Sequence, residues 1–194
     1  MRFLPGLICL LPLLSPLAHA ELIDDVNDRG ELRIALEANT PPFNFKDEDK
    51  LTGFEVELGQ LLANELDVRA DFVVTDSNDL LTGVESGKYD IAINHITETP
   101  ALTERFDFSQ PYIQTNAQLI AQKEEPRSIL LVQSLTEEKP KADQTVSLAI
   151  PFQKGNPAFH ASLENALQRI KAHGRLEALS QKWLGADTSV APNP

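Results

Sequence analysis

The sequence predicts an α/β fold in which a mostly parallel sheet is covered by helices on both faces. Along the first half of the chain, short apolar strands alternate with segments whose apolar residues recur at helical spacing. Strands joined by helices in this order run parallel, with right-handed crossovers. Residues 91–93 form an apolar, β-branched-rich triplet without polar alternation, which is typical of a central strand buried on both faces.

Each element of the first half has its own signal. Gly30 and Gly87 each follow an apolar-periodic segment and predict a helix end, while Ser77 is a candidate N-cap. Gly53 precedes a stretch with apolar residues at i, i+4, i+7, i+8 and i+12, which indicates an amphipathic helix. The predicted elements are helix 21–29, strand 32–36, helix 54–66, strand 68–75, helix 77–86 and strand 91–93.

The second half changes in composition. After a predicted strand at 118–121, residues 123–145 are charged and contain prolines, with a short apolar run at 129–132. This composition indicates a linker or an extended arm, or one half of a hairpin. A strand at 146–150 and two helices follow, and Asn156-Pro157 marks the start of the first helix. Residues 186–194 are expected to form a disordered tail.

Residues 1–20 have the features of a secretory signal peptide, with one basic residue, an apolar run and the cleavage pattern Ala18-His19-Ala20. The apolar run contains Pro12 and is too short to span a membrane. We therefore expect export, a mature chain beginning near Glu21, and no membrane insertion after cleavage. The sole cysteine, Cys9, lies in the segment that is removed, which predicts a mature chain without disulfides.

The formal net charge of the whole chain is −12. This balance argues against nucleic acid and anionic membranes as partners, because both attract basic surfaces. The sequence contains no ligand spacing for zinc and no nucleophile motif, so we expect no metal and no cofactor.

Short polar side chains follow the predicted central strand. Asn94, His95, Thr97 and Thr99 come directly after residues 91–93. In open α/β sheets, ligands bind in the crevice beyond the carboxyl ends of the strands, so this crest is a candidate binding site. A solvated turn would have the same composition, and both interpretations stay open.

The sequence between Ser86 and Tyr112 has the order S-G-K-Y-D, apolar triplet, T-x-T-P, six residues, D-F-S-x-P-Y. Two further blocks, at 32–58 and 154–185, follow the same family pattern in the same order. Together they resemble the family 3 extracellular solute-binding proteins, the polar amino-acid receptors of bacterial ABC importers. The resemblance implies a periplasmic, non-catalytic protein that binds a small amino-acid-like solute and works with an ABC permease or a sensor.

Members of this family close two α/β lobes on the solute. Here residues 21–122 together with 146–185 account for the first lobe, and only residues 123–145 stand where the second lobe is expected. That segment is too short for a lobe with its own core. The resemblance therefore implies a periplasmic-binding-protein-like single lobe, in which 123–145 replaces the second lobe.

The resemblance also assigns candidate ligand-binding positions. Glu37 stands where an aspartate near the ligand's amino group is usual, and Thr40 stands where an aromatic residue often stacks. Phe43 either walls the pocket or closes the core, with the core preferred. Asn94 and His95 replace small residues, while Thr97 is kept. The candidate residues are thus Glu37, Thr40, Phe43, Asn94, His95 and Thr97.

Leu102 stands at the position of the arginine that clamps a carboxylate in the family. Leucine has no polar donor, so the clamp is expected to be lost. Arg105 could compensate only if the intervening helix were shifted in register.

Two other functions remain open. The first is a protein-interaction module that has lost its ligand, for example a homodimer formed through 123–145, since exposed strand edges pair readily. The second, less favoured, is a periplasmic dehydratase-like enzyme, for which His95 beside Glu37 is the only acid/base basis.

Overall fold

The computed structural model describes residues 21–116 and 145–189. The predicted signal peptide, the strand predicted at 118–121, nearly all of the arm at 123–145 and the last five residues lie outside the described residues. In chain order the elements are α1 (Leu22–Arg29), β1 (Glu31–Leu36), β2 (Asn39–Thr40), β3 (Asn44–Asp47), β4 (Lys50–Thr52), α2 (Phe54–Glu65), β5 (Arg69–Val74), α3 (Ser77–Glu85), β6 (Ile91–Ala92), α4 (Pro100–Thr103), β7 (Phe106–Phe108), β8 (Ile113–Asn116), β9 (Thr145–Leu148), β10 (Pro151–Gln153), α7 (Pro157–Ala172) and α8 (Arg175–Leu184).

A five-stranded sheet with the order β5-β1-β6-β10-β7 organises the described residues. β1 pairs in parallel with both β5 and β6, and β10 pairs antiparallel with β6 and β7. This arrangement confirms the predicted α/β class with a mostly parallel sheet.

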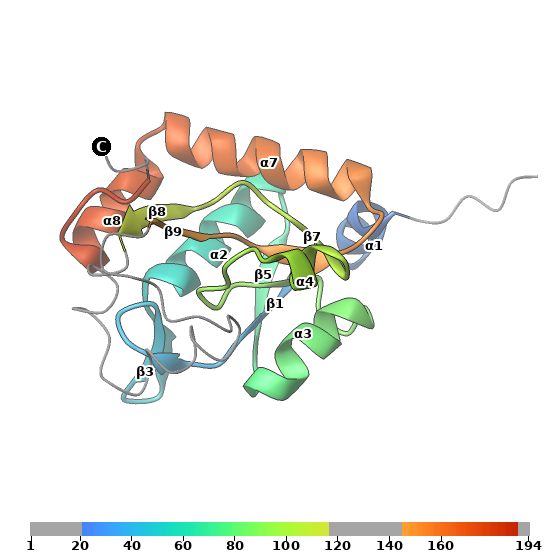
Figure 1. Ribbon diagram of the computed structural model, residues 1–194, viewed down its shortest axis with the longest axis horizontal. Coiled ribbons are helices and arrows are strands. Elements are labelled where there is room, and N and C mark those ends of the chain that lie inside the picture. Colours follow the sequence, from blue (N-terminus) through green and yellow to red (C-terminus); the bar gives the residue numbers. More distant parts are fainter. Residues whose placement is uncertain (1–20, 117–144, 190–194) are drawn as a thin grey trace, which may run out of the picture.

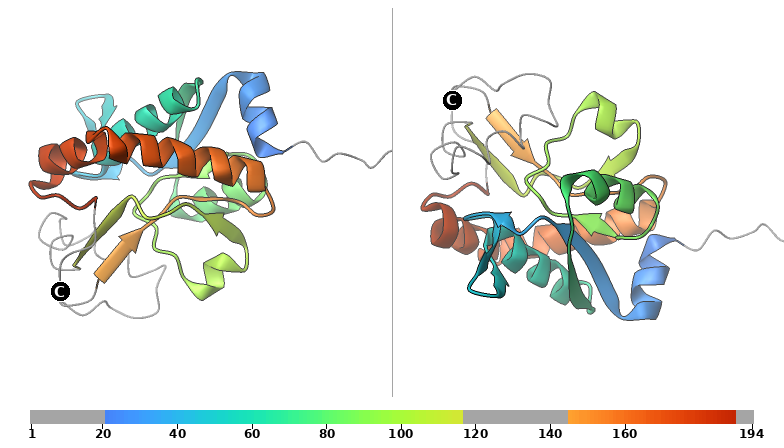
Figure 2. Two further views of the ribbon diagram at one scale, coloured as in Figure 1. Left: turned by 90° about the horizontal axis from the view of Figure 1, so that it is seen from above. Right: turned by 90° about the horizontal axis from the view of Figure 1, so that it is seen from below.

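Helices cover both faces of this sheet (Figures 1 and 2). α7 lies over one face with α2 and α8, while α3 lies on the opposite face. Two apolar clusters reflect this division. In β6, Ile91 packs into the cluster beneath α2, α7 and α8, while its neighbour Ala92 packs into the cluster with Leu80 and Val84 of α3. Because successive side chains of a strand point to opposite faces of the sheet, this short buried strand contributes to the apolar clusters on both faces.

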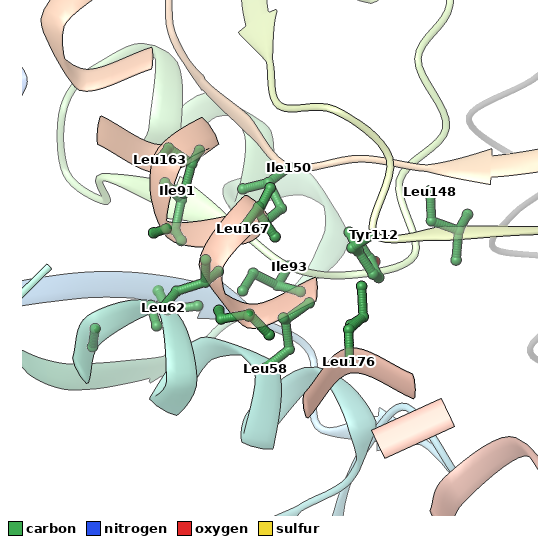
Figure 3. Packing of buried hydrophobic residues seen from close by; sticks show 14 of the residues in the cluster. Leu58, Leu62, Ile91, Ile93, Tyr112, Leu148, Ile150, Leu163, Leu167 and Leu176 are labelled. Carbon is green, nitrogen blue, oxygen red and sulfur yellow. The ribbon is translucent and has the colours of Figure 1, made fainter. Parts of the chain in front are cut away.

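The larger cluster joins distant parts of the chain (Figure 3). Leu58 and Leu62 of α2 and Leu163 and Leu167 of α7 point toward one another and toward Ile93. All of these side chains are almost completely buried. The C-terminal helices therefore complete the core that the first half of the chain begins.

Two local predictions need correction. The strand predicted at 146–150 ends earlier than expected, because β9 stops at Leu148 and pairs with β8, while a separate strand beyond the predicted range, β10, enters the main sheet. The helix predicted to begin with a Ser77 cap is capped instead by Asp76, whose carboxylate accepts hydrogen bonds from the N–H groups of Asn78 and Asp79. Asp at an N-cap satisfies these exposed donors as well as Ser does.

The predicted tail also begins later than expected. Thr188 is buried, its carbonyl oxygen accepts a 2.8 Å hydrogen bond from Gln114 N, and its hydroxyl lies 3.0 Å from Ser180 Oγ. These polar contacts fasten residues 186–189 to β8 and α8, so the prediction of a disordered tail from residue 186 was wrong for its first residues.

Candidate binding site

The candidate site lies where β1 and β6 end side by side. Ala35 pairs with Ala92, and Ile93 N donates to Ala35 O at 3.0 Å. Because the two strands are parallel, Glu37, the first residue after β1, and Asn94, the second residue after β6, meet at the same edge of the sheet. The sheet topology thus brings together two predicted site residues that are far apart in sequence.

Glu37 and Asn94 bind each other reciprocally. The Asn94 side-chain amide donates to Glu37 Oε2 at 2.9 Å, and Asn94 Oδ1 accepts from Glu37 N at 3.1 Å. Glu37 is partly exposed whereas Asn94 is buried. The buried amide therefore holds a carboxylate that solvent can reach.

Asn44 extends this pair. Its Oδ1 accepts from Ala38 N at 2.9 Å, and its Nδ2 donates to Asn94 Oδ1 at 3.1 Å. Ala38 has a φ of 63°, a left-handed conformation that is uncommon for a residue other than glycine. The hydrogen bond from Ala38 to Asn44 stabilises this turn just after β1.

Glu55 is the buried centre of the site. Its carboxylate is fully buried and accepts hydrogen bonds from Asn44 Nδ2 at 2.5 Å, His95 N at 2.6 Å and Tyr112 Oη at 2.5 Å. His95 Nδ1 lies 3.5 Å from Glu55 Oε2. A buried carboxylate is tolerated only when it is well bonded, and three donors satisfy that condition.

These contacts shift two pKa values in opposite directions. Burial by itself raises the pKa of Glu55, but the neighbouring His95 and the hydrogen bonds from His95, Tyr112 and Asn44 together hold that pKa below its ordinary value. Burial, reinforced by the Glu55 charge, raises the pKa of Tyr112 well above its ordinary value. Tyr112 therefore remains a hydrogen-bond donor and Glu55 an acceptor.

His95 is held in place from several sides. Its φ is 40°, its backbone N–H is bound by Glu55, and its ring lies 5.6 Å from that of Phe43, centroid to centroid. The side chain is almost completely buried. This placement makes His95 part of the framework beneath the site rather than a group directed at solvent.

The six predicted site residues thus divide into two groups. Glu37 and Thr97 are partly exposed. Thr40, Phe43, Asn94 and His95 are buried, with Thr40 Oγ1 bound to Asn39 Oδ1 at 2.9 Å. In the structure as it stands, only the first group can meet a solute directly. The burial of Phe43 agrees with the preferred interpretation of this residue as core.

A depression of about 490 Å³ lies beside Thr97, between α4 and β9. The described residues that line it contribute four hydroxyl groups and one carboxylate and include no lysine or arginine; they are Thr97, Glu98, Thr99, Pro100, Thr103, Pro111 and Ser147. A solute there would meet hydroxyl groups and a negative charge.

Leu102 is 8% exposed and packs in the apolar cluster with Phe106. Arg105 does not replace the missing arginine, because it forms two hydrogen bonds with Glu85 of α3, at 3.0 and 2.6 Å. Lys154 donates to the carbonyl oxygens of Thr103 and Glu104. The cations around α4 that the structure describes are therefore engaged elsewhere.

The residues that organise the site were not among those predicted from the sequence. Glu55, Asn44 and the Tyr112 hydroxyl are all absent from the six predicted site residues. One signal was available for Glu55, which stands three and seven residues before Leu58 and Leu62 and so shares their buried face. A carboxylate on the apolar face of a helix indicates a buried polar network.

Within the described ranges, no helix is long and apolar enough to cross a membrane. The same residues contain no cluster of three or more acidic, histidine or cysteine side chains suited to a metal ion.

A lobe of this topology, with polar groups at the carboxyl ends of its parallel strands, defines a solute-binding type of fold. The model of the bacterial extracellular solute-binding proteins, family 3, matches residues 32–186, and the chain belongs to this family. Its fold is that of the periplasmic binding proteins.

Three proteins are similar to this chain in sequence or in fold. The L-cystine-binding protein TcyJ of Escherichia coli K12 is 25% identical over 237 residues, covering 89% of this chain and 89% of that protein. The ancestral amino acid-binding protein AncCDT-1, a precursor of cyclohexadienyl dehydratase, has a TM-score of 0.69 at 23% identity, covering 85% of this chain and 100% of that one. A mutant of the arginine-bound form of domain 1 from TmArgBP has a TM-score of 0.60 at 24% identity. The match covers 77% of this chain and 98% of that one.

Proposed function

We propose that this protein is an exported, non-catalytic binding protein of one lobe that holds a small, amino-acid-like solute at the ends of β1 and β6. Glu37 would accept the solute's ammonium group, and Thr97 would contribute a hydroxyl group. The proposed partner is an ABC permease or a sensor. The single observation that carries the proposal is the partly exposed Glu37 carboxylate, oriented by the buried amide of Asn94.

The one-lobe form is supported by the length of the alignment with TcyJ. That alignment extends over 237 residues, whereas the whole chain has 194, so parts of TcyJ have no counterpart here. The antiparallel pairing of β8 with β9 is a second support, because it brings Asn116 opposite Thr145. The chain can thus leave and re-enter the lobe at one place, with residues 117–144 between. The similarity to domain 1 of TmArgBP, described as arginine-bound, supports solute binding by a lobe of this kind.

The charges favour a solute with an exposed amine over one with only carboxylates. Glu37 and Glu98 supply negative charge, the described residues that line the depression beside Thr97 include no lysine or arginine, and Arg105 is paired with Glu85. An ammonium group is attracted by such a site, whereas a carboxylate would meet repulsion without a guanidinium partner.

The non-catalytic part of the proposal is supported by the placement of His95. This side chain is 2% exposed and lies against Glu55, so it is not presented to a solute as a general acid or base. The family consists of solute-binding proteins.

The test is a thermal-shift and calorimetric screen of the mature chain with L-arginine, L-cystine, putrescine and L-glutamate. We expect the melting temperature to rise with the concentration of an amine-bearing solute and not with that of L-glutamate. Glu37→Gln should weaken binding at least tenfold, because it removes the charge that pairs with the ammonium group. Glu48→Gln, an exposed change on the β3–β4 turn, is the matched control and should bind as the wild type does.

Failure of every solute to shift the wild-type protein would reject the binding role. A dimeric mass in light scattering of the same sample would then favour the interaction-module alternative. Tighter binding of L-glutamate than of L-arginine would leave a binding role but reject the assignment of Glu37 as the group that accepts an ammonium.

A further inference from the structure

We infer that Glu55 is a positioning residue, which fixes the Glu37 carboxylate from inside the core through two side-chain amides. The consequence for solute binding rests on the proposed function, while the positioning itself does not. The carboxyl groups of Glu55 and Glu37 form the two ends of a continuous chain of hydrogen bonds, and Asn44 and Asn94 lie between them.

Each amide in the chain has only one possible orientation. Asn44 Oδ1 accepts from Ala38 N, so Asn44 must direct its NH₂ group toward Glu55 and Asn94. Asn94 Oδ1 accepts from Asn44 and from Glu37 N, so the Asn94 NH₂ group must face Glu37 Oε2. The Ala38 N–H group and the Glu55 acceptor, on either side of Asn44, thus fix together the direction of the hydrogen bonds up to Glu37.

The same carboxylate shapes the backbone after β6. Glu55 Oε1 binds His95 N at 2.6 Å, in a residue whose φ is 40°. On the β1 side, Asn44 binds the N–H group of Ala38, whose φ is 63°. Two uncommon left-handed residues therefore flank the site, and each depends on Glu55 directly or through one amide.

Replacing Glu55 by glutamine would place a donor where this order requires an acceptor. The new side chain has one acceptor and one NH₂ group, and if its oxygen serves His95 and Tyr112, the NH₂ group faces the NH₂ group of Asn44. Asn44 cannot turn over, because its oxygen would leave the Ala38 N–H group without an acceptor. The two facing NH₂ groups therefore repel each other, and the displacement of Asn44 that results disturbs its hydrogen bond to Asn94 and, through Asn94, the position of Glu37.

The experiment measures amide hydrogen exchange by NMR in the mature wild type, Glu55→Gln and Glu57→Gln. The last variant is a matched control: Glu57 lies in the same first turn of α2 but pairs with Lys182 on the surface. In Glu55→Gln we expect the amides of Glu37, Ala38 and His95 to exchange at least tenfold faster. The Asp90 amide, bound to Arg33 O at the other end of the sheet, should keep its wild-type rate, as should all four amides in Glu57→Gln.

A purely structural role for Glu55 would accelerate exchange uniformly, and that result overturns the inference, as does an unchanged rate at Glu37 and Ala38. Should Glu55→Gln fail to fold, Glu55→Asp takes its place. The aspartate side chain is one methylene shorter and keeps the carboxylate. The amides of Glu37, Ala38 and His95 should again exchange faster than in the wild type, but by a smaller factor than expected for Glu55→Gln.

Calorimetry with L-arginine on the same samples separates the inference from the proposed function. Local acceleration of exchange with at least tenfold weaker L-arginine binding in Glu55→Gln supports both. Local acceleration without any L-arginine binding by the wild type supports the positioning role and counts against the proposed function. Wild-type affinity retained in Glu55→Gln, with unchanged exchange, rejects the positioning role and leaves the proposed function intact.

Discussion

Glu37 and Asn94 are bound to each other twice, through Asn94 Nδ2 to Glu37 Oε2 at 2.9 Å and through Glu37 N to Asn94 Oδ1 at 3.1 Å. Residues just beyond the ends of two parallel strands are thereby joined into one unit. Because Asn94 also accepts from Asn44, and Asn44 binds the buried Glu55, the exposed carboxylate is connected to the core. The exposed carboxylate at the proposed site is therefore tied to a group that also contributes to the stability of the lobe.

Stability should fall on acidification below about pH 4.5, in part because of Glu55. Its folded-state pKa is lowered from 4.5, so below that pH the unfolded chain takes up a proton that the folded chain still excludes. The stabilisation is present at neutral pH and is lost as the pH falls through the folded-state pKa. Urea denaturation at a series of pH values between 7 and 3 gives the free energy of unfolding as a function of pH. The slope of that plot should be less steep in Glu55→Gln than in the wild type, by up to about 1.4 kcal/mol per pH unit. If the free energy of unfolding depended on pH equally in the wild type and in Glu55→Gln, Glu55 would not contribute to the loss of stability in acid.

Asp90→Asn should destabilise the lobe by about 3 kcal/mol. The Asp90 carboxylate is fully buried and binds Arg29 at 2.6 Å and Arg33 at 2.7 Å, so its loss leaves two partly buried guanidinium groups without their anion. The two arginines remain about a quarter to a third exposed, which places the cost at the lower end for a buried pair. Chemical denaturation measures it.

The matched control is Asp79→Asn. Asp79 and Lys88 are both mostly exposed and 3.7 Å apart. Removing this pair should cost less than about 0.5 kcal/mol. Equal effects of the two substitutions would mean that burial does not determine the contribution of Asp90.

Gly53→Ala should cost more than about 2 kcal/mol, because a Cβ atom at this position would lie 2.3 Å from the carbonyl oxygen of Phe43. The backbone also has a φ of 123°, a conformation that alanine avoids. Gly30→Ala is the control: its φ of 67° is unfavourable, but no atom lies within 4 Å, so about 1 kcal/mol is expected. A thermal melt of both variants that gave equal losses would argue against close backbone contact before α2.

Leu163→Ala should destabilise the protein by about 2–5 kcal/mol, because Leu163 of α7 is fully buried and packs into the larger apolar cluster (Figure 3). Val74→Ala, at a side chain that is 46% exposed, should change stability by less than about 0.5 kcal/mol. Urea denaturation of the two variants provides the comparison. A small effect at Leu163 would show that α7 contributes little to the core.

Several elements of this fold could be predicted from local sequence signals. Apolar residues at the spacing of α2 and α7, the glycine after α1 and the Asn156-Pro157 start of α7 specify elements through local chemistry, and the structure confirms them. The apolar triplet at 91–93 likewise predicted a buried central strand, and β6 occupies that position. The family was also accessible from the sequence, because its motifs lie within continuous stretches of chain.

The hydrogen-bond partners of the site residues, in contrast, depend on the tertiary structure. Nothing local to Glu55 states that its partners come from β3, from the turn after β6 and from Tyr112, because those contacts are made by strand order and helix packing. The same holds for burial. His95 and Asn94 read as an exposed polar crest, yet both lie beneath the surface, because the Glu55 carboxylate and the Asn44 amide supply the hydrogen bonds that water would otherwise supply. Hydrogen bonds between distant residues depend on the whole fold, and this is why the sequence predicted the edge at which the site lies but not the buried carboxylate that organises it.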